Sequence, residues 1–174
     1  VQTATTGGEP IHGGAVCCGI WGTGGGTWNG INQSFTPTPG YIYRANAWFL
    51  VSAGGPIADA ATAWLEVNFY NNGNLMNSYQ SAIISSNSVV GAWSNLTVTA
   101  VAPAGANEVR CQINYHAGGG GGGLIYVDDV NFLLRIPVTI TPSVSGTNLL
   151  LSFQTQVGVT NQILYKNNLS DATW

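Results

Sequence analysis

Charged residues are scarce in this chain. Its 174 residues include four Lys and Arg and seven Asp and Glu, which is 6% of the total and gives a net charge of −3 at pH 7. An average soluble domain is about a quarter charged. Nucleic-acid binding depends on clustered Lys and Arg that neutralise phosphates, so this composition excludes nucleic acid as a partner.

Long apolar runs and helix signals are also lacking. No stretch approaches the roughly 18 continuous apolar residues that a membrane span requires, so no membrane span is predicted. No window combines a 3.6-residue apolar period, good helix formers and a capped start. The sequence therefore predicts a chain with little or no helix.

Catalytic signals are equally poor. The two histidines, His12 and His116, lie in neither a nucleophile motif nor a metal-ligand spacing such as His-Glu-x-x-His. Glycoside hydrolysis requires two carboxylates opposed across a cleft. The candidate carboxylates instead lie on predicted strands, among structural or surface neighbours: Glu66, Glu108, Asp128 and Asp129. We therefore expect a protein that is not an enzyme.

What the chain does contain is a series of aromatic and β-branched runs bounded by turn residues, which is typical of β-strands. These predicted strands span residues 41–52, 62–70, 79–85, 93–101, 108–116 and 124–134. In 108–116 the odd-numbered residues from Val109 to Tyr115 are apolar or aromatic, and the even-numbered residues from Arg110 to His116 are polar. This period of two predicts half-buried antiparallel strands.

Two segments carry turn signals. Asn71-Asn72-Gly73-Asn74 predicts a tight hairpin, because Asn and Gly tolerate positive φ. Residues 118–123 are six consecutive glycines, and the backbone entropy of such a run predicts a mobile loop. The alternative is a place where another backbone or a ligand approaches closely, since no Cβ intervenes.

The chain has three cysteines, Cys17, Cys18 and Cys111, which is an odd number. In an oxidising compartment the simplest arrangement is one disulfide and one remaining thiol that can bridge to another chain. The alternative is that all three are small buried apolar residues.

The composition changes after residue 136. Three further short strands are predicted at 138–143, 149–154 and 162–165. A piece this small cannot cover an apolar face alone. We therefore divide the chain into a first domain, 1–136, and a C-terminal β-strand extension or partial second β module, 137–174. The extension must pack on the first domain, continue further, or pair with a neighbour.

A set of short fragments, in their order along the chain, suggests a family. They are Ile11-His12-Gly13-Gly14, YIYRANAW at 41–48, GAW at 91–93, APAGA at 102–106, EVR at 108–110 and IYVDDV at 125–130. Residues 1–134 thereby resemble jelly-roll carbohydrate-binding modules, the galactose-binding-like sandwiches of secreted bacterial proteins. The part from 137 resembles short β modules at the ends of large secreted bacterial proteins.

The resemblance implies an all-β chain, with a two-sheet jelly-roll-like β-sandwich and a short C-terminal β extension, located outside the cell or at its surface. The opening strand motif of the family is missing from residues 1–10. We therefore expect a sandwich that lacks its first strand and leaves an edge open to strands from other chains.

The resemblance also implies a structural calcium ion near the last strand. In the family an acidic pair equivalent to Asp128 and Asp129 often helps to hold the ion, together with carbonyl groups from the loop that matches 11–14. Calcium binds six to eight oxygens, which carboxylates and carbonyls supply. The alternative is that these aspartates form hydrogen bonds to a turn.

Aromatic rings offer the remaining candidate site, because a flat ring stacks on the C–H face of a sugar. Trp48, Trp64 and Trp93 fall within apolar alternation and are expected in the core. The candidates for glycan binding, or for burial between subunits, are residues beside loops: Trp21, Trp28, Tyr70 and Tyr79.

Two functional hypotheses arise from these observations. In the first, the chain is a non-enzymatic structural subunit of an extracellular bacterial fibre or surface assembly, and its partners are other copies of itself joined by strand addition and neutral faces. In the alternative, it is a glycan-binding module of a secreted glycosidase or adhesin, and its partner is a polysaccharide.

Overall fold

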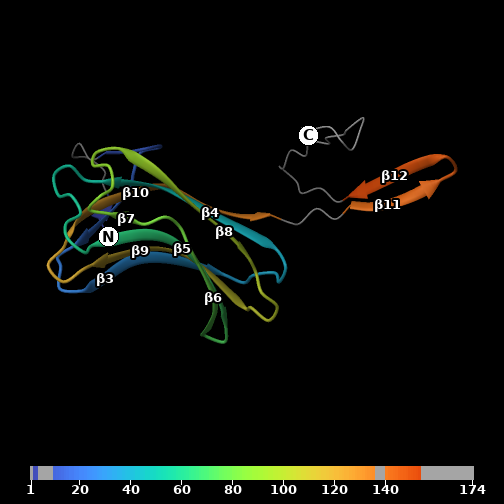
Figure 1. Ribbon diagram of the computed structural model, residues 1–174, viewed down its shortest axis with the longest axis horizontal. Helices are drawn as coiled ribbons and strands as arrows, with labels where there is room; N and C mark the ends of the chain where they lie inside the picture. Colours follow the sequence, from blue (N-terminus) through green and yellow to red (C-terminus); the bar gives the residue numbers. More distant parts are fainter. Residues whose placement is uncertain (1, 4–9, 136–139, 154–174) are drawn as a thin grey trace. The chain divides into compact units, whose positions relative to one another are not determined.

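The computed structural model describes residues 2–3, 10–135 and 140–153 (Figure 1). The chain divides into two compact units, Val1–Arg135 and Ile136–Trp174. All described elements are strands, so the all-β prediction is confirmed. Within the described ranges, no helix is long and apolar enough to cross a membrane.

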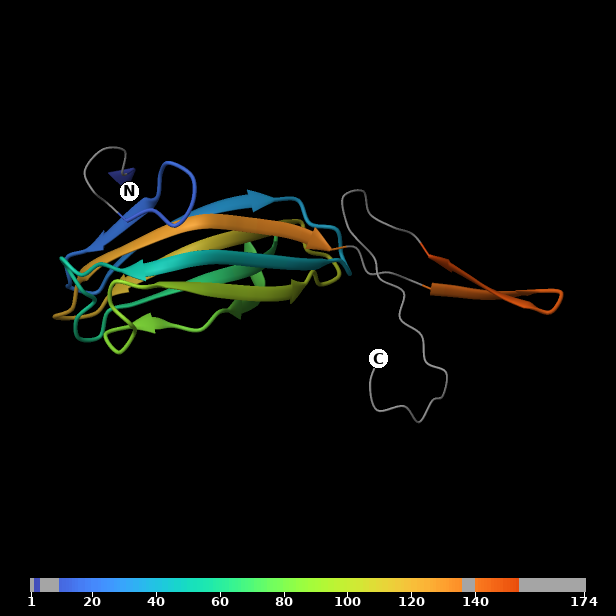
Figure 2. The ribbon, with the colours of Figure 1, turned by 90° about the horizontal axis from the view of Figure 1, so that it is seen from above.

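The first unit is a sandwich of two antiparallel sheets. Sheet A has the order β1 (Gln2–Thr3), β2 (Cys18–Gly22), β10 (Gly123–Arg135), β4 (Ile42–Val51) and β8 (Trp93–Val101). Sheet B has the order β3 (Thr27–Phe35), β9 (Glu108–Ala117), β5 (Thr62–Asn71) and β6 (Asn74–Gln80), with β7 (Ile84–Ser85) also paired to β5. Figure 2 looks onto sheet A and shows β10, in orange, beside β4, in teal.

The core lies between the two sheets. Strict alternation places the odd-numbered residues of β9, from Val109 to Ala117, in it. The largest fully buried side chains include Tyr115, Phe49 and Phe69. Burial of one such ring contributes about 1.5–3 kcal/mol. The predicted alternation of this strand is confirmed, and it leaves the polar residues of β9 on the outer surface of sheet B.

The predicted hairpin at 71–74 is also confirmed. Asn71 pairs with Asn74 across the turn, and the two central residues, Asn72 and Gly73, have φ values of 48° and 80°. Asn107 stabilises the turn from a neighbouring loop, because its Nδ2 donates to Asn72 Oδ1 at 2.8 Å and its Oδ1 accepts the Asn72 N–H at 3.0 Å.

Most of the six-glycine run lies against other backbone, namely Gly118, Gly121, Gly122 and Gly123. Ala58 N–H donates to Gly122 O at 3.0 Å. A Cβ at Gly121 would overlap Ala58 O, and one at Gly118 would lie 2.6 Å from Ala60 O. Of the two interpretations of this run, close backbone approach describes the structure, because neighbouring main chain occupies the space that side chains would need.

Several strand predictions need correction. The sandwich has a border strand, because Gln2 and Thr3 of β1 pair with Gly19 and Cys18 of β2. The predicted strand at 79–85 is interrupted, since β6 ends at Gln80 and β7 contains two residues. The long strand β3 was not predicted, because its residues are mostly exposed and show no apolar alternation.

The second unit contains a hairpin of β11 (Ile140–Ser145) and β12 (Asn148–Phe153), whose strands pair from Ile140–Phe153 to Ser145–Asn148. They correspond to the first two strands predicted after residue 137. The third predicted strand, 162–165, lies outside the described residues.

Candidate functional site

The outer surface of sheet B gathers aromatic, amide and carboxylate side chains. We call it the sheet-B face. In Figure 1 sheet B is the lower layer of the sandwich, and it bows so that its outer surface lies on the inside of the curve. Strand register and burial place these residues on the face: Trp28, Asn32, Trp64, Glu66, Asn68, Tyr70, Ser78, Arg110, Gln112, Asn114 and His116.

Two tryptophans and a histidine form an aromatic group at one end of this face. Trp28 on β3 is 64% exposed, although it belongs to a strand. Its ring meets Trp64 of β5 edge to face, with centroids 5.7 Å apart, and lies 4.4 Å from the ring of His116 on β9. These contacts hold a large apolar ring in solvent in a defined orientation.

Glu66, on β5, is the centre of a hydrogen-bond network. Its Oε2 accepts Trp64 Nε1–H at 2.7 Å and Asn114 Nδ2–H at 2.6 Å, and its Oε1 accepts Ser78 Oγ–H at 2.7 Å. These bonds fix the indole of Trp64 and the amide of Asn114 relative to one another. The polar groups of the face are therefore preorganised.

Asn68 lies two residues further along β5 and forms a separate hydrogen bond on the same face. Its Nδ2 donates to Gln112 Oε1 at 2.8 Å. Its Oδ1 is buried and, among the described side chains, is the one such atom without a hydrogen-bond partner. A buried carbonyl without a donor is energetically costly, so a hydroxyl or water that reached it would be stabilised.

Arg110 and Glu108 form an ion pair at the other end of the face. Arg110 Nε and Nη2 donate to the two carboxylate oxygens of Glu108 at 2.6 and 3.1 Å. This hydrogen bond lowers the pKa of Glu108 and raises the pKa of Arg110. The guanidinium also lies 4.2 Å from the centre of the Tyr70 ring, so it covers one face of that ring.

The four aromatic candidates from the sequence have different locations. Trp28 and Tyr70 lie on the sheet-B face. Trp21 is 56% exposed but lies on the outer side of sheet A, next to Gly55. Tyr79 packs against the core and contacts Phe69 edge to face.

The three tryptophans expected in the core lie on outer faces. Trp64 is on the sheet-B face, and Trp48 and Trp93 are on the outer face of sheet A. The sequence did contain a signal for Trp64. Leu65 and Val67 are buried apolar residues of β5, so alternation places Trp64 and Glu66 on the opposite side.

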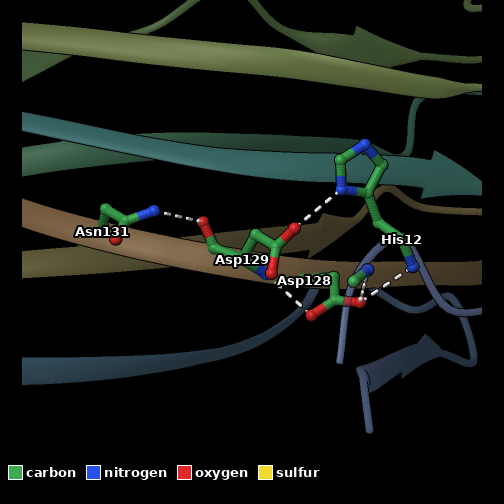
Figure 3. A network of polar contacts seen from close by, with 5 residues as sticks. His12, Asp128, Asp129 and Asn131 are labelled. Carbon is green, nitrogen blue, oxygen red and sulfur yellow. Dashed lines mark hydrogen bonds and ion pairs between the residues drawn. The ribbon is translucent and has the colours of Figure 1, made fainter. Parts of the chain in front are cut away.

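Asp128 and Asp129, the candidate calcium ligands, form hydrogen bonds to the loop at 11–14 (Figure 3). Asp128 Oδ2 accepts the backbone N–H groups of His12 and Gly13, at 2.9 and 3.1 Å, and its Oδ1 accepts the N–H of Asp129 at 2.7 Å. His12 Nδ1–H donates to Asp129 Oδ2 at 2.7 Å, and Asn131 Nδ2 donates to Asp129 O at 3.0 Å.

This donor set does not fit calcium. The loop turns N–H groups toward Asp128, where a calcium site needs carbonyl oxygens. No cluster of three or more His, Cys, Asp or Glu side chains occurs in the described part of the chain. The alternative, aspartates bonded to a turn, describes these hydrogen bonds, and the calcium site stays a prediction that this arrangement of donors does not favour.

His12 also covers aromatic surface on sheet A. Its ring stacks on Trp48, with centroids 4.0 Å apart and an interplanar angle of 19°, and it meets Trp93 edge to face at 5.4 Å. The segment before β2 is thereby fixed over the outer face of sheet A by hydrogen bonds to Asp128 and by ring contacts.

Cys18 on sheet A and Cys111 on sheet B are free thiols, so these two are not joined to one another. A disulfide that links two chains stays a prediction. Cys17 and Cys111 are buried. Burial raises the pKa of the Cys111 thiol to about 11 and also raises the pKa of Cys18. Cys18 and Cys111 pack as small apolar residues, as the alternative interpretation proposed.

Comparison with known proteins identifies the fold. No family model matches the chain, and no curated protein does. Among solved structures, it is similar to the enzymatically active domain of tailspike protein 4 from bacteriophage CBA120, with a TM-score of 0.54 and 17% identity over 76% of this chain and 17% of that chain.

It is also similar to a structure described as carbohydrate-binding modules of the β-sandwich superfamily, with a TM-score of 0.54 and 14% identity over 75% of this chain and 51% of that chain. A family 16 carbohydrate-binding module matches with a TM-score of 0.48 and 16% identity, over 70% of this chain and 79% of that chain. The match with a TM-score of 0.54 to carbohydrate-binding modules shows that the chain has their β-sandwich fold, as the sequence resemblance predicted. The chain spans about half the length of the protein from the β-sandwich superfamily and about a sixth of the length of the tailspike domain.

Proposed function

We propose that this chain is a non-catalytic glycan-binding module and that the sheet-B face is its binding surface. The observation that carries the proposal is the exposed ring of Trp28, held by Trp64 and His116 beside a preorganised group of amides around Glu66. Rings stack on the C–H face of a sugar, and amide and carboxylate groups bond its hydroxyls.

The composition supports the same role. Few ions need to lose water when a neutral chain covers the face, because the described side chains on it that carry a formal charge are Glu66, Glu108 and Arg110, and the last two already pair with one another. A polysaccharide ligand also fits the extracellular location that we infer for the protein. The alternative hypothesis from the sequence is therefore favoured over the fibre subunit.

Titration calorimetry and affinity electrophoresis against a panel of soluble polysaccharides test the proposal. We expect Trp28→Ala to weaken binding of the best ligand about tenfold to one-hundredfold, because one stacked ring contributes about 1–3 kcal/mol. Trp21→Ala is the matched control, because it removes a similarly exposed ring from sheet A. Equal losses in the two variants, or no binding to any polysaccharide, would reject the sheet-B face.

Self-assembly remains the second candidate, and the edge of β3 is the observation that favours it. This strand pairs with β9 on one side and contains no charged residue or proline, the usual protections of an exposed edge. Light scattering during size-exclusion chromatography distinguishes the two functions. A monomer at all concentrations would remove the assembly hypothesis.

A further inference from the structure

Glu66 has a special position on the sheet-B face, and the role inferred for it rests on the proposed glycan-binding function of that face. The residue lies on β5, between β9 and β6. It accepts hydrogen bonds from one side chain on each of these three strands: Trp64, Asn114 and Ser78. All three donors are neutral, so they orient the carboxylate without cancelling its charge.

Among the described residues, no basic side chain forms an ion pair with Glu66. Arg110 pairs with Glu108, and the ring of His12 contacts Asp129. Arg110 lies on the same face, but Glu108 and the ring of Tyr70 already engage its guanidinium. The face therefore presents one uncompensated negative charge among neutral amides and rings.

We propose that Glu66 determines the charge selectivity of the sheet-B face, which accepts neutral or amine-bearing glycans and rejects those with carboxylate or sulfate groups. A ligand anion near an unpaired carboxylate is repelled, and the ligand displaces the water that would screen this repulsion. A hydroxyl or an ammonium group, in contrast, donates to the carboxylate. Three of its roughly four lone-pair sites are used, which leaves room for one ligand donor.

Glu66→Gln tests the charge without dismantling the network. The glutamine Oε1 can accept from Trp64 and Asn114, and its NH₂ group can donate to the hydroxyl oxygen of Ser78, which accepts as well as donates. The variant therefore keeps the shape of the site and removes the negative charge.

The experiment uses the neutral polysaccharide that binds best in the panel, together with its carboxymethyl and hydroxyethyl derivatives at matched substitution. The hydroxyethyl form controls for the bulk of the substituent. We expect the unmodified protein to bind the carboxymethyl form about tenfold more weakly than the hydroxyethyl form at low salt. Glu66→Gln should remove most of this difference, and an aminoethyl derivative should bind the unmodified protein more tightly than the variant.

The outcomes separate this inference from the proposed function. If the unmodified protein binds the two derivatives equally, or if Glu66→Gln leaves their ratio unchanged, charge selectivity by Glu66 is rejected while glycan binding stands. If no polysaccharide binds at all, both proposals are rejected.

Discussion

The two outer faces of the sandwich have similar aromatic groups, but these groups differ in whether another segment of the chain covers them. Each face has a group of two tryptophans with one histidine ring in contact with them: Trp48, Trp93 and His12 on sheet A, and Trp28, Trp64 and His116 on sheet B. His12 belongs to a segment that crosses sheet A from outside, whereas His116 is part of β9. The aromatic group on sheet A is thus covered by its own chain, whereas Trp28 on sheet B is left to solvent, as is Trp21, which lies elsewhere on sheet A.

This difference shows that aromatic residues on a sheet do not by themselves make a binding surface. On sheet A, the backbone N–H groups of His12 and Gly13 bind Asp128, so the covering segment has a fixed position. On sheet B, the polar groups bond to one another within the sheet, and Trp28 stays 64% exposed. The proposed ligand would take the place on sheet B that His12 takes on sheet A.

Among the variants that test the difference between the two faces, Asp128→Ala should cause the largest loss of stability. This change removes the acceptor of three backbone N–H groups and should lower the free energy of unfolding by about 3 kcal/mol, as measured by urea denaturation. Asp129→Asn is the control, because Asn tolerates the positive φ of that position. It should cost much less, and equal losses in the two variants would show that the covering segment does not depend on Asp128.

His12→Ala should have a smaller effect, about 1–2 kcal/mol, because it removes one ring stack and one hydrogen bond. Trp48 and Trp93 should gain solvent, which shifts tryptophan fluorescence to longer wavelength. The matched variant is His116→Ala, which we expect to leave stability nearly unchanged and to weaken glycan binding through Trp28. If both variants destabilise equally, the two faces do not differ in how they are covered.

The smallest expected effect concerns pH and the ion pair on sheet B. Because Arg110 lowers the pKa of Glu108 in the folded protein, the pair stabilises the fold above the unfolded pKa of Glu, and this contribution is lost as pH falls through the folded pKa. Both groups are partly exposed at the surface, so the change should be slight. Thermal unfolding between pH 7 and pH 3 should show a slightly smaller drop for Glu108→Gln than for the unmodified protein.

Alternation and turn chemistry predicted most of the sandwich. The strand at 93–101 has the predicted bounds, and the hairpin at 71–74 forms as expected, because both depend on local sequence. β3 was missed because an exposed edge strand needs no apolar period. The disulfide and calcium predictions depended on contacts between distant segments, which spacing along the chain does not determine.

The candidate site was predictable in part. The polar side of β9 contained Gln112, Asn114 and His116, and Trp28 was selected for its position beside a glycine-rich loop. Glu66 was considered only as a catalytic acid. Its role as an acceptor for Asn114 and Ser78 arises from the pairing of three strands, and no feature of one strand indicates that arrangement.

The packed glycine run has a consequence for anyone who redesigns this module. At positions 118, 121, 122 and 123 a methyl group would collide with main chain, whereas Gly119 has open space around its Cα. Alanine should thus be accepted at 119 and refused at 121. A peptide tag or a crosslinking residue is therefore best placed at position 119. In a library that randomises all six glycine codons, most variants should place a side chain where it collides with main chain.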